Sequence, residues 1–154
     1  MDNITKKASK IKLLGTDIDG VWTDSKMYVT PDGEWMKAFS TYDGMAVSML
    51  QKKGYIIAIL TSENTDIVKS RAKKLKIDEV YVDEHEKLKR LIYLSKKYEI
   101  SMNQIAYIGD DINDLEALKA VGFSALTANS PIQNQFKPDY VTVRKGGHGA
   151  FREF

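Results

Sequence analysis

The sequence has no cysteine among its 154 residues, which excludes disulfide bonds, cysteine-ligated zinc and thiol nucleophiles. It also lacks a long apolar run. No stretch approaches the roughly 18 residues of a membrane-spanning helix, and the first ten residues contain no apolar region typical of a secretion signal. We therefore expect a cytoplasmic protein that does not bind membranes.

A strong net charge is missing as well. The 23 basic and 21 acidic residues give a formal charge of only +2. Basic residues cluster over 69–76 and 87–90, but aromatic residues do not alternate with them as a stacking platform for nucleic acid requires. We interpret these clusters as solvated helix faces and predict no nucleic-acid partner.

What the sequence does contain is an alternation of short apolar runs with helical patterns. Six apolar runs predict strands at residues 11–18, 55–60, 79–82, 104–110, 122–127 and 140–143. Helical periodicity lies between most of them, at 65–75, 84–98 and about 112–120, and a further helix is expected to begin near residue 42. Such alternation predicts right-handed crossovers in an α/β fold, a Rossmann-like doubly wound parallel sheet. The length suits a single domain over residues 1–154.

Two segments depart from this alternation. Residues 25–42 hold two strand-like arms around the turn sequence of residues 30–33, Thr-Pro-Asp-Gly, and predict an inserted β-hairpin. Its apolar side chains would pack either on their own domain or on another subunit. The segment of about 144–154 has three glycines around His148 and is expected to be a flexible tail.

Polar residues that follow the predicted strands suggest the chemistry, because ligands of open parallel sheets bind beyond the carboxyl ends of the strands. Asp17 and Asp19 follow the first strand, Thr61 the second and Asp110 the fourth, while Lys87 lies near the start of the helix after the third. Each signal is weak alone, since a threonine after a strand often caps a helix. Together they supply oxygen ligands suited to Mg²⁺, and a hydroxyl and an ammonium for phosphate oxygens. A divalent ion would also neutralise the crowded carboxylates.

The order DxDGVxTD, a strand ending in threonine, a lysine and then GDDxND resembles the haloacid dehalogenase (HAD) superfamily of phosphohydrolases over essentially the whole chain. The length leaves no room for a cap domain. The hairpin, the stretch KAFSTYDGMAV and the tail are similar to the capless branch that dephosphorylates 2-keto-3-deoxy sugar acid phosphates. That branch includes 3-deoxy-D-manno-octulosonate (KDO) 8-phosphate phosphatase and relatives that act on KDN 9-phosphate or sialic acid 9-phosphate. The resemblance implies a homotetramer in which hairpins associate and a neighbouring subunit covers each active site. For the tail it implies an alternative to mere flexibility, a segment that swings over a neighbouring active site and helps the product leave.

The resemblance also implies a catalytic role for four residues. Asp17 would be the nucleophile and would form an aspartyl-phosphate. Asp19 would protonate the leaving sugar oxygen and then act as the base for water. Thr61 would hold a phosphoryl oxygen, and Lys87 would pair with Asp17 and another phosphoryl oxygen.

The expected cofactor is Mg²⁺. The resemblance implies that Asp17, Asp110 and the backbone carbonyl of Asp19 hold the ion, while Asp111 and Asp114 support these ligands.

The substrate is predicted from the residues after Thr61. Octulosonate phosphatases typically have Gly-Arg there, whereas this chain has Ser62 and Glu63, followed along the helix by Arg71 and Lys74. This pattern is similar to the nine-carbon branch, so we predict KDN 9-phosphate or N-acetylneuraminate 9-phosphate, with KDO 8-phosphate as the alternative. The two distal basic side chains would bind a carboxylate at the far end of the substrate, or contact a neighbouring subunit, or lie on a solvated face.

Two other classes compete with this hypothesis. A phosphoreceiver domain also uses acidic residues, a threonine and a lysine on a parallel sheet, but its phosphorylated aspartate follows the third strand and not the first. A non-catalytic HAD module that serves only oligomerisation is disfavoured because all the catalytic residue types are present.

Overall fold

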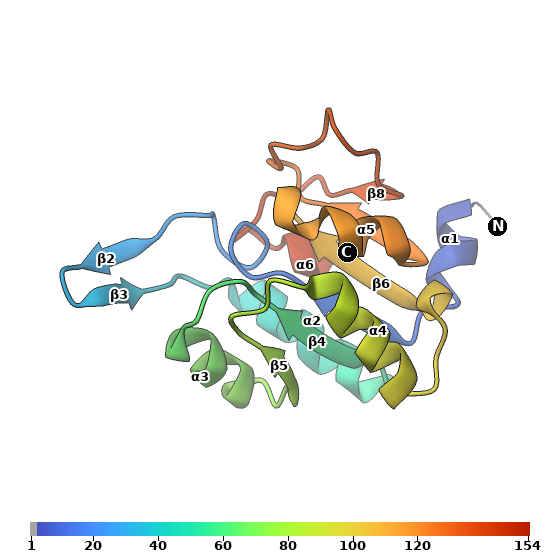
Figure 1. The fold of residues 1–154 in the computed structure, drawn as a ribbon, viewed down its shortest axis with the longest axis horizontal. Coiled ribbons are helices and arrows are strands. Elements are labelled where there is room, and N and C mark those ends of the chain that lie inside the picture. The colour runs from blue at the N-terminus through green and yellow to red at the C-terminus, as the bar shows by residue number, and fades with distance from the viewer. Residues whose placement is uncertain (1–2) are drawn as a thin grey trace.

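A six-stranded parallel sheet forms the centre of the computed structural model, which describes residues 3–154 (Figure 1). The strand order is β5-β4-β1-β6-β7-β8. These strands are β1 (Leu13–Thr16), β4 (Ile56–Leu60), β5 (Glu79–Tyr81), β6 (Ile105–Gly109), β7 (Phe123–Leu126) and β8 (Tyr140–Val141). Each lies within one of the six predicted apolar runs, and the near-complete burial of β1, β6 and β7 explains why those runs are apolar on both faces.

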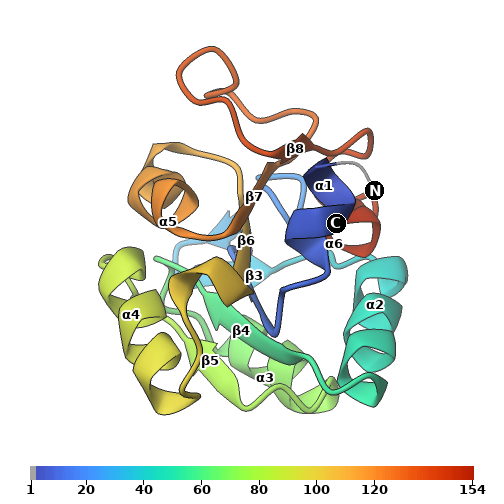
Figure 2. The ribbon, with the colours of Figure 1, turned by 90° about the vertical axis from the view of Figure 1, so that its right-hand side faces the viewer.

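Helices cover both faces of the sheet (Figure 2). One face packs against α2 (Thr41–Lys52), α3 (Asp66–Lys74) and α6 (Ala150–Glu153), and the other against α4 (Lys87–Lys97) and α5 (Leu115–Ala120). Short helices complete the described chain: α1 (Asn3–Ala8), η1 (Met102–Gln104) and η2 (Ile112–Asp114). The predicted doubly wound α/β fold is therefore confirmed. Among the described helices, none combines the length and the apolar character that a bilayer crossing requires.

The chain changes faces between β1 and β6, which are neighbours in the sheet. The helices after β1 and β4 lie on one face, and those after β5 and β6 lie on the other. The segments that leave β1 and β6 therefore diverge and open a crevice at the carboxyl ends of these two strands. Asp17 and Asp110 are the first residues after those strands.

The hairpin predicted over residues 25–42 consists of β2 (Tyr28–Thr30) and β3 (Gly33–Met36), paired antiparallel and separate from the main sheet. It projects away from the body of the molecule (Figure 1). Val29 and Trp35 are 66% and 67% exposed. These apolar side chains therefore do not fold onto the domain that carries them.

The C-terminal segment, for which the sequence predicts a flexible tail, ends in a short helix. Its last residues form α6, and Phe151 is buried with its ring centroid 5.0 Å from that of Trp22. The carboxylate of Asp43 accepts a hydrogen bond from the backbone N–H of Arg152 at 2.9 Å. The aromatic side chains of residues 150–154 pack on the core, a contribution that the neighbouring glycines obscured in the sequence, while the flexibility of the tail stays a prediction.

Candidate active site

The end of β1 is held rigidly. The backbone N–H of Asp17 donates to the carbonyl of Ile108 on β6, and the Thr16 hydroxyl donates to the carbonyl of Asp17 at 2.7 Å. The indole N–H of the fully buried Trp22 donates in turn to the Thr16 hydroxyl at 3.0 Å. A side chain at this position is therefore presented from an ordered backbone, as in-line attack on a bound group requires.

The chain turns sharply after Asp19, and Gly20 makes this turn possible. Gly20 has φ +90°, and a Cβ atom there would lie 1.8 Å from Oδ2 of Asp110. Only glycine tolerates both the left-handed conformation and the close approach. The loop after β1 can therefore lie directly against the carboxylate that follows β6.

Lys87, at the first position of α4, lies between two carboxylates. Its Nζ atom is 3.0 Å from Oδ1 of Asp17 and 2.7 Å from Oδ1 of Asp114. Asp114 is fully buried and also accepts hydrogen bonds from the Tyr107 hydroxyl at 2.7 Å and from two backbone N–H groups of the preceding loop. Both oxygens of Asp114 are thus occupied, and this carboxylate fixes the lysine and the loop after β6.

These elements surround a cavity of about 210 Å³. Six predicted site residues line it: Asp17, Asp19, Thr61, Ser62, Glu63 and Asp110. Sequence reasoning did not assign Ser25 and Asn113, which also line it, and the Asn113 amide donates to the Ser62 hydroxyl at 3.2 Å. The structure therefore brings together residues from three separate segments of the chain, which follow β1, β4 and β6.

The electrostatics of the cavity favour a bound cation. Burial, together with the neighbouring Asp114 carboxylate, raises the pKa of Asp17 to about 7 despite the attraction of Lys87. Burial and repulsion from Asp17 and other carboxylates raise the pKa of Asp110 to about 8. Ligand oxygens of Asp17, Asp110 and Asp114 lie within 4.8 Å of one another. Since Asp114 is already occupied, Asp17 and Asp110 have the free oxygen ligands that a hard divalent ion prefers.

The carboxylate of Asp19 has two unlike oxygens. Its Oδ1 accepts a hydrogen bond from Nζ of Lys37 at 2.6 Å, whereas Oδ2 is buried and has no hydrogen-bond partner among residues 3–154. Sequence reasoning missed Lys37. Lys37 stands out in the sequence as a single lysine between the apolar residues of the second hairpin arm. Its partner Asp19 could not be identified without the fold.

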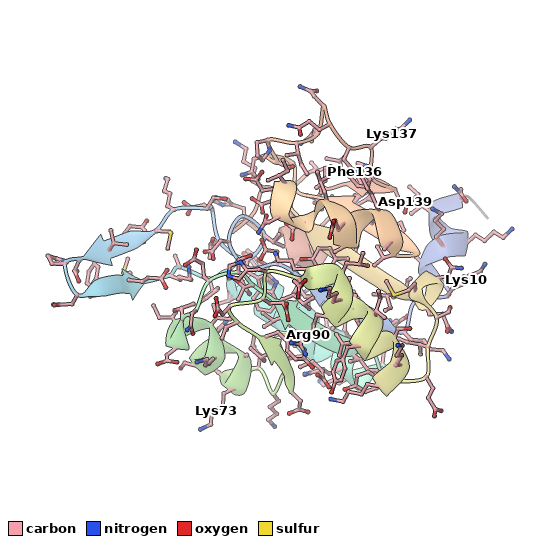
Figure 3. All side chains as sticks on the ribbon, in the orientation of Figure 1. Lys10, Lys73, Arg90, Phe136, Lys137 and Asp139 are labelled. Carbon is pink, nitrogen blue, oxygen red and sulfur yellow. The ribbon has the colours of Figure 1, made fainter. Side chains whose placement is uncertain are left out.

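Arg71 and Lys74 do not line the cavity in the described chain. The guanidinium of Arg71 lies 5.7 Å from the ring centroid of Phe39, and its Nε is buried without a hydrogen-bond partner among the described residues. Lys74 is exposed on α3, as is the adjacent Lys73, which points into solvent (Figure 3). Their assignment to the far end of the substrate, or to a neighbouring subunit, stays a prediction.

Arg90 orients the segment that precedes Lys87. Its Nε donates to the Glu84 carboxylate at 2.6 Å, and its guanidinium lies 4.1 Å from the ring centroid of Tyr81 (Arg90 is labelled in Figure 3). The backbone N–H of Glu84 donates to the Thr61 carbonyl at 2.9 Å. These contacts hold the segment that leads into Lys87 against Thr61 at the end of β4.

Comparison with known proteins identifies relatives of this chain. A family model described as haloacid dehalogenase-like hydrolase matches residues 34–122, which is more than half of the chain. The 3-deoxy-D-manno-octulosonate 8-phosphate phosphatase KdsC of Haemophilus influenzae is 36% identical over 148 residues, covering 96% of this chain and 82% of that protein. The same-named protein of Yersinia pestis is 35% identical over 152 residues, covering 99% of this chain and 81% of that protein.

Solved structures agree with the sequence relatives. The 3-deoxy-D-manno-octulosonate 8-phosphate phosphatase of Moraxella catarrhalis, solved with a magnesium ion, a phosphate ion and KDO, superimposes with a TM-score of 0.94 at 38% identity. The match covers 99% of this chain and 88% of that one.

Proposed function

This chain belongs to the haloacid dehalogenase-like hydrolases and is a phosphoric monoester hydrolase of their capless branch, and we propose that its substrate is KDO 8-phosphate. The residues after Thr61 favoured a nine-carbon substrate, but the names of the relatives support the eight-carbon alternative better. Glu63, on which the nine-carbon prediction depended, lines the cavity with an exposed side chain. It is not enclosed by other groups, so it does not by itself limit the length of the sugar.

The observation that carries the phosphatase mechanism is the position of the Asp17 carboxylate. It lies at the end of a rigid strand, faces the cavity and is 3.0 Å from the Lys87 ammonium. A nucleophile and a cation are thus placed together where a phosphoryl group would enter, and positioning with charge stabilisation supplies most of the catalysis in phosphoryl transfer.

In the first step, a carboxylate oxygen of Asp17 attacks phosphorus and forms the aspartyl-phosphate, while the bond from phosphorus to the sugar oxygen breaks. Asp19 donates its proton to that leaving oxygen. Thr61 and Lys87 bind phosphoryl oxygens and stabilise the charge that develops on them.

In the second step, Asp19, now a carboxylate, takes a proton from water. The water oxygen attacks phosphorus and the bond from phosphorus to Asp17 breaks, which releases phosphate and restores the free carboxylate. Asp19 ends the cycle protonated, so both protons are accounted for.

Mg²⁺ is the cofactor that fits this site. Asp17, Asp110 and the backbone carbonyl of Asp19 would hold it, and the raised pKa values of the two buried carboxylates show why a cation is favourable there. When bound, the ion neutralises the carboxylates and withdraws charge from the phosphoryl group.

The exposed hairpin supports a homotetramer. Five apolar side chains are exposed on this small hairpin: Met27, Tyr28, Val29, Trp35 and Met36. Exposed apolar surface concentrated on one element in this way typically marks a protein interface. We propose that hairpins of neighbouring subunits pack together, and that a neighbour limits access to each cavity.

The proposed substrate is tested by comparing kcat/KM for KDO 8-phosphate, KDN 9-phosphate and N-acetylneuraminate 9-phosphate with Mg²⁺ present. We expect the eight-carbon substrate to be preferred by at least about tenfold, which is about 1.4 kcal/mol of differential transition-state binding. A preference for either nine-carbon ester would reinstate the prediction from the Ser62-Glu63 pair. If hydrolysis with Mg²⁺ did not exceed that of an EDTA control for any of the three substrates, a non-catalytic module would be favoured instead.

A further inference from the structure

Lys37 is a buried cation on an otherwise exposed hairpin. It directly follows β3, whose neighbouring residues Trp35 and Met36 are exposed, yet its own side chain has 0% exposure. Its Nζ atom lies 2.6 Å from Oδ1 of Asp19 and 2.6 Å from Oε1 of Glu34. The hairpin thus inserts one ammonium group between its own carboxylate and the carboxylate at the active site.

The carboxylates on either side of the Lys37 ammonium offset the cost of burying it. A buried ammonium is stable only with such partners, so the three groups fix one another in position. Because the hairpin backbone holds Lys37, it also determines the position of Asp19.

The contact leaves one oxygen of Asp19 available. Oδ1 is bound by Lys37, whereas Oδ2 is buried and has no hydrogen-bond partner within residues 3–154. Asp19 lines the cavity, and because Oδ2 has no partner among the described residues, we assign the transferred proton to this oxygen.

We propose that Lys37 is a positioning residue, which holds Asp19 in one orientation so that its free oxygen delivers the proton to the leaving sugar oxygen. This inference rests on the proposed role of Asp19 as general acid. Lys37 itself is not among the residues that line the cavity, and it contacts Oδ1 of Asp19 rather than the oxygen assigned to the proton.

The test compares leaving groups in a Lys37→Met variant. A sugar alkoxide is a poor leaving group and needs the proton from Asp19, whereas p-nitrophenolate leaves without one. The readout is kcat/KM, because it reports the steps up to departure of the leaving group and is insensitive to the later attack of water. We expect kcat/KM to fall about 100-fold for the sugar acid phosphate and less than about threefold for p-nitrophenyl phosphate.

Two further variants separate positioning from general damage. Lys26→Met removes another lysine that pairs with an aspartate, Asp24, but its side chain is 73% exposed, and both activities should remain unchanged. In an Asp19→Asn background, adding Lys37→Met should cause no further loss, because the lysine acts only through that carboxylate. Circular dichroism and thermal melting confirm that each variant is folded.

The sugar substrate is whichever of the three sugar acid phosphates the wild-type enzyme hydrolyses fastest, so an error in the proposed substrate does not affect this test. Equal losses with both leaving groups, no loss with either, or a further loss in the Asp19→Asn background would each overturn the inference. A wild-type enzyme that hydrolyses neither the sugar phosphates nor p-nitrophenyl phosphate would overturn the proposed function itself, and the inference with it.

Discussion

Asp114 has no chemical step in the proposed mechanism, yet it organises the site. Its fully buried carboxylate binds Lys87, the Tyr107 hydroxyl and two backbone N–H groups. Removing it leaves a buried ammonium with one carboxylate fewer and several donors without an acceptor. We therefore predict that Asp114→Ala lowers the free energy of unfolding by about 3–5 kcal/mol, measured by urea denaturation.

The neighbouring Asp111 is a matched control for that variant. It is exposed, and its side chain accepts a short hydrogen bond from the backbone N–H of Ile112 at the start of η2. Asp111→Ala should cost only about 1 kcal/mol, the usual contribution of a cap. Equal losses for the two variants would contradict the role assigned to Asp114.

The two carboxylates expected to hold Mg²⁺ predict how stability depends on pH. Folding raises the pKa of Asp17 from 3.8 to about 7 and that of Asp110 from 3.8 to about 8. The folded state therefore binds these protons more tightly than the unfolded state, and the metal-free protein loses stability as the pH rises from about 4 to 8.

Mg²⁺ should offset this loss where the carboxylates are charged. At 100 times its dissociation constant it stabilises by about 2.7 kcal/mol, so the melting temperature at pH 8 should rise by roughly 5–10 °C, and by less at pH 5. Asp110→Asn should abolish the response. A wild-type melting temperature that does not change with Mg²⁺ at pH 8 would exclude these residues as the metal site.

The site residues divide into those that the sequence could reveal and those that it could not. Asp17, Asp19, Thr61 and Asp110 follow apolar strands, so their convergence depends only on parallel topology. Lys37 reaches the site through a hairpin whose direction no local pattern specifies. Such contacts between distant segments require the fold.

At the level of chain segments, the glycine-containing segment after β8 packs against the loop that follows Asp17. The N–H of Gly147 donates to the carbonyl of Val21, and a Cβ atom on Gly146 would lie 1.9 Å from the carbonyl oxygen of Gly20. We predict that Gly146→Ala displaces this loop and lowers kcat at least about tenfold, measured with p-nitrophenyl phosphate.

Lys145→Ala, at an exposed adjacent position, should leave kcat unchanged. If Gly146→Ala were fully active, the segment would not support the loop after β1.

The strands were easier to predict than the terminal helices for a physical reason. Buried parallel strands need apolar residues on both faces, which leaves a clear signal. Helix α1 buries none of its described residues, and an ion pair between Lys7 and Asp139 holds it, so it has no apolar periodicity. Helix α6 is a single turn whose burial depends on Phe151 alone among large side chains.

For the molecule as a whole, the hairpin predicts association. Trp35, 67% exposed, is the largest apolar side chain on it. We predict that Trp35→Lys converts a tetramer into smaller species, measured by light scattering coupled to size-exclusion chromatography. Asp32→Lys, at the polar turn of the same hairpin, should keep the assembly intact. A wild-type protein that is monomeric at high concentration would contradict the proposed interface.

The central claim is that Asp17 becomes covalently phosphorylated during turnover. The most direct measurement is to quench the enzyme with acid during hydrolysis of KDO 8-phosphate, reduce it with borohydride and identify the modified peptide by mass spectrometry. Reduction converts an aspartyl-phosphate into homoserine. We predict homoserine at position 17 alone, and none in an Asp17→Asn variant. Modification of a different carboxylate, or unmodified Asp17 in an enzyme that is turning over, would contradict the account.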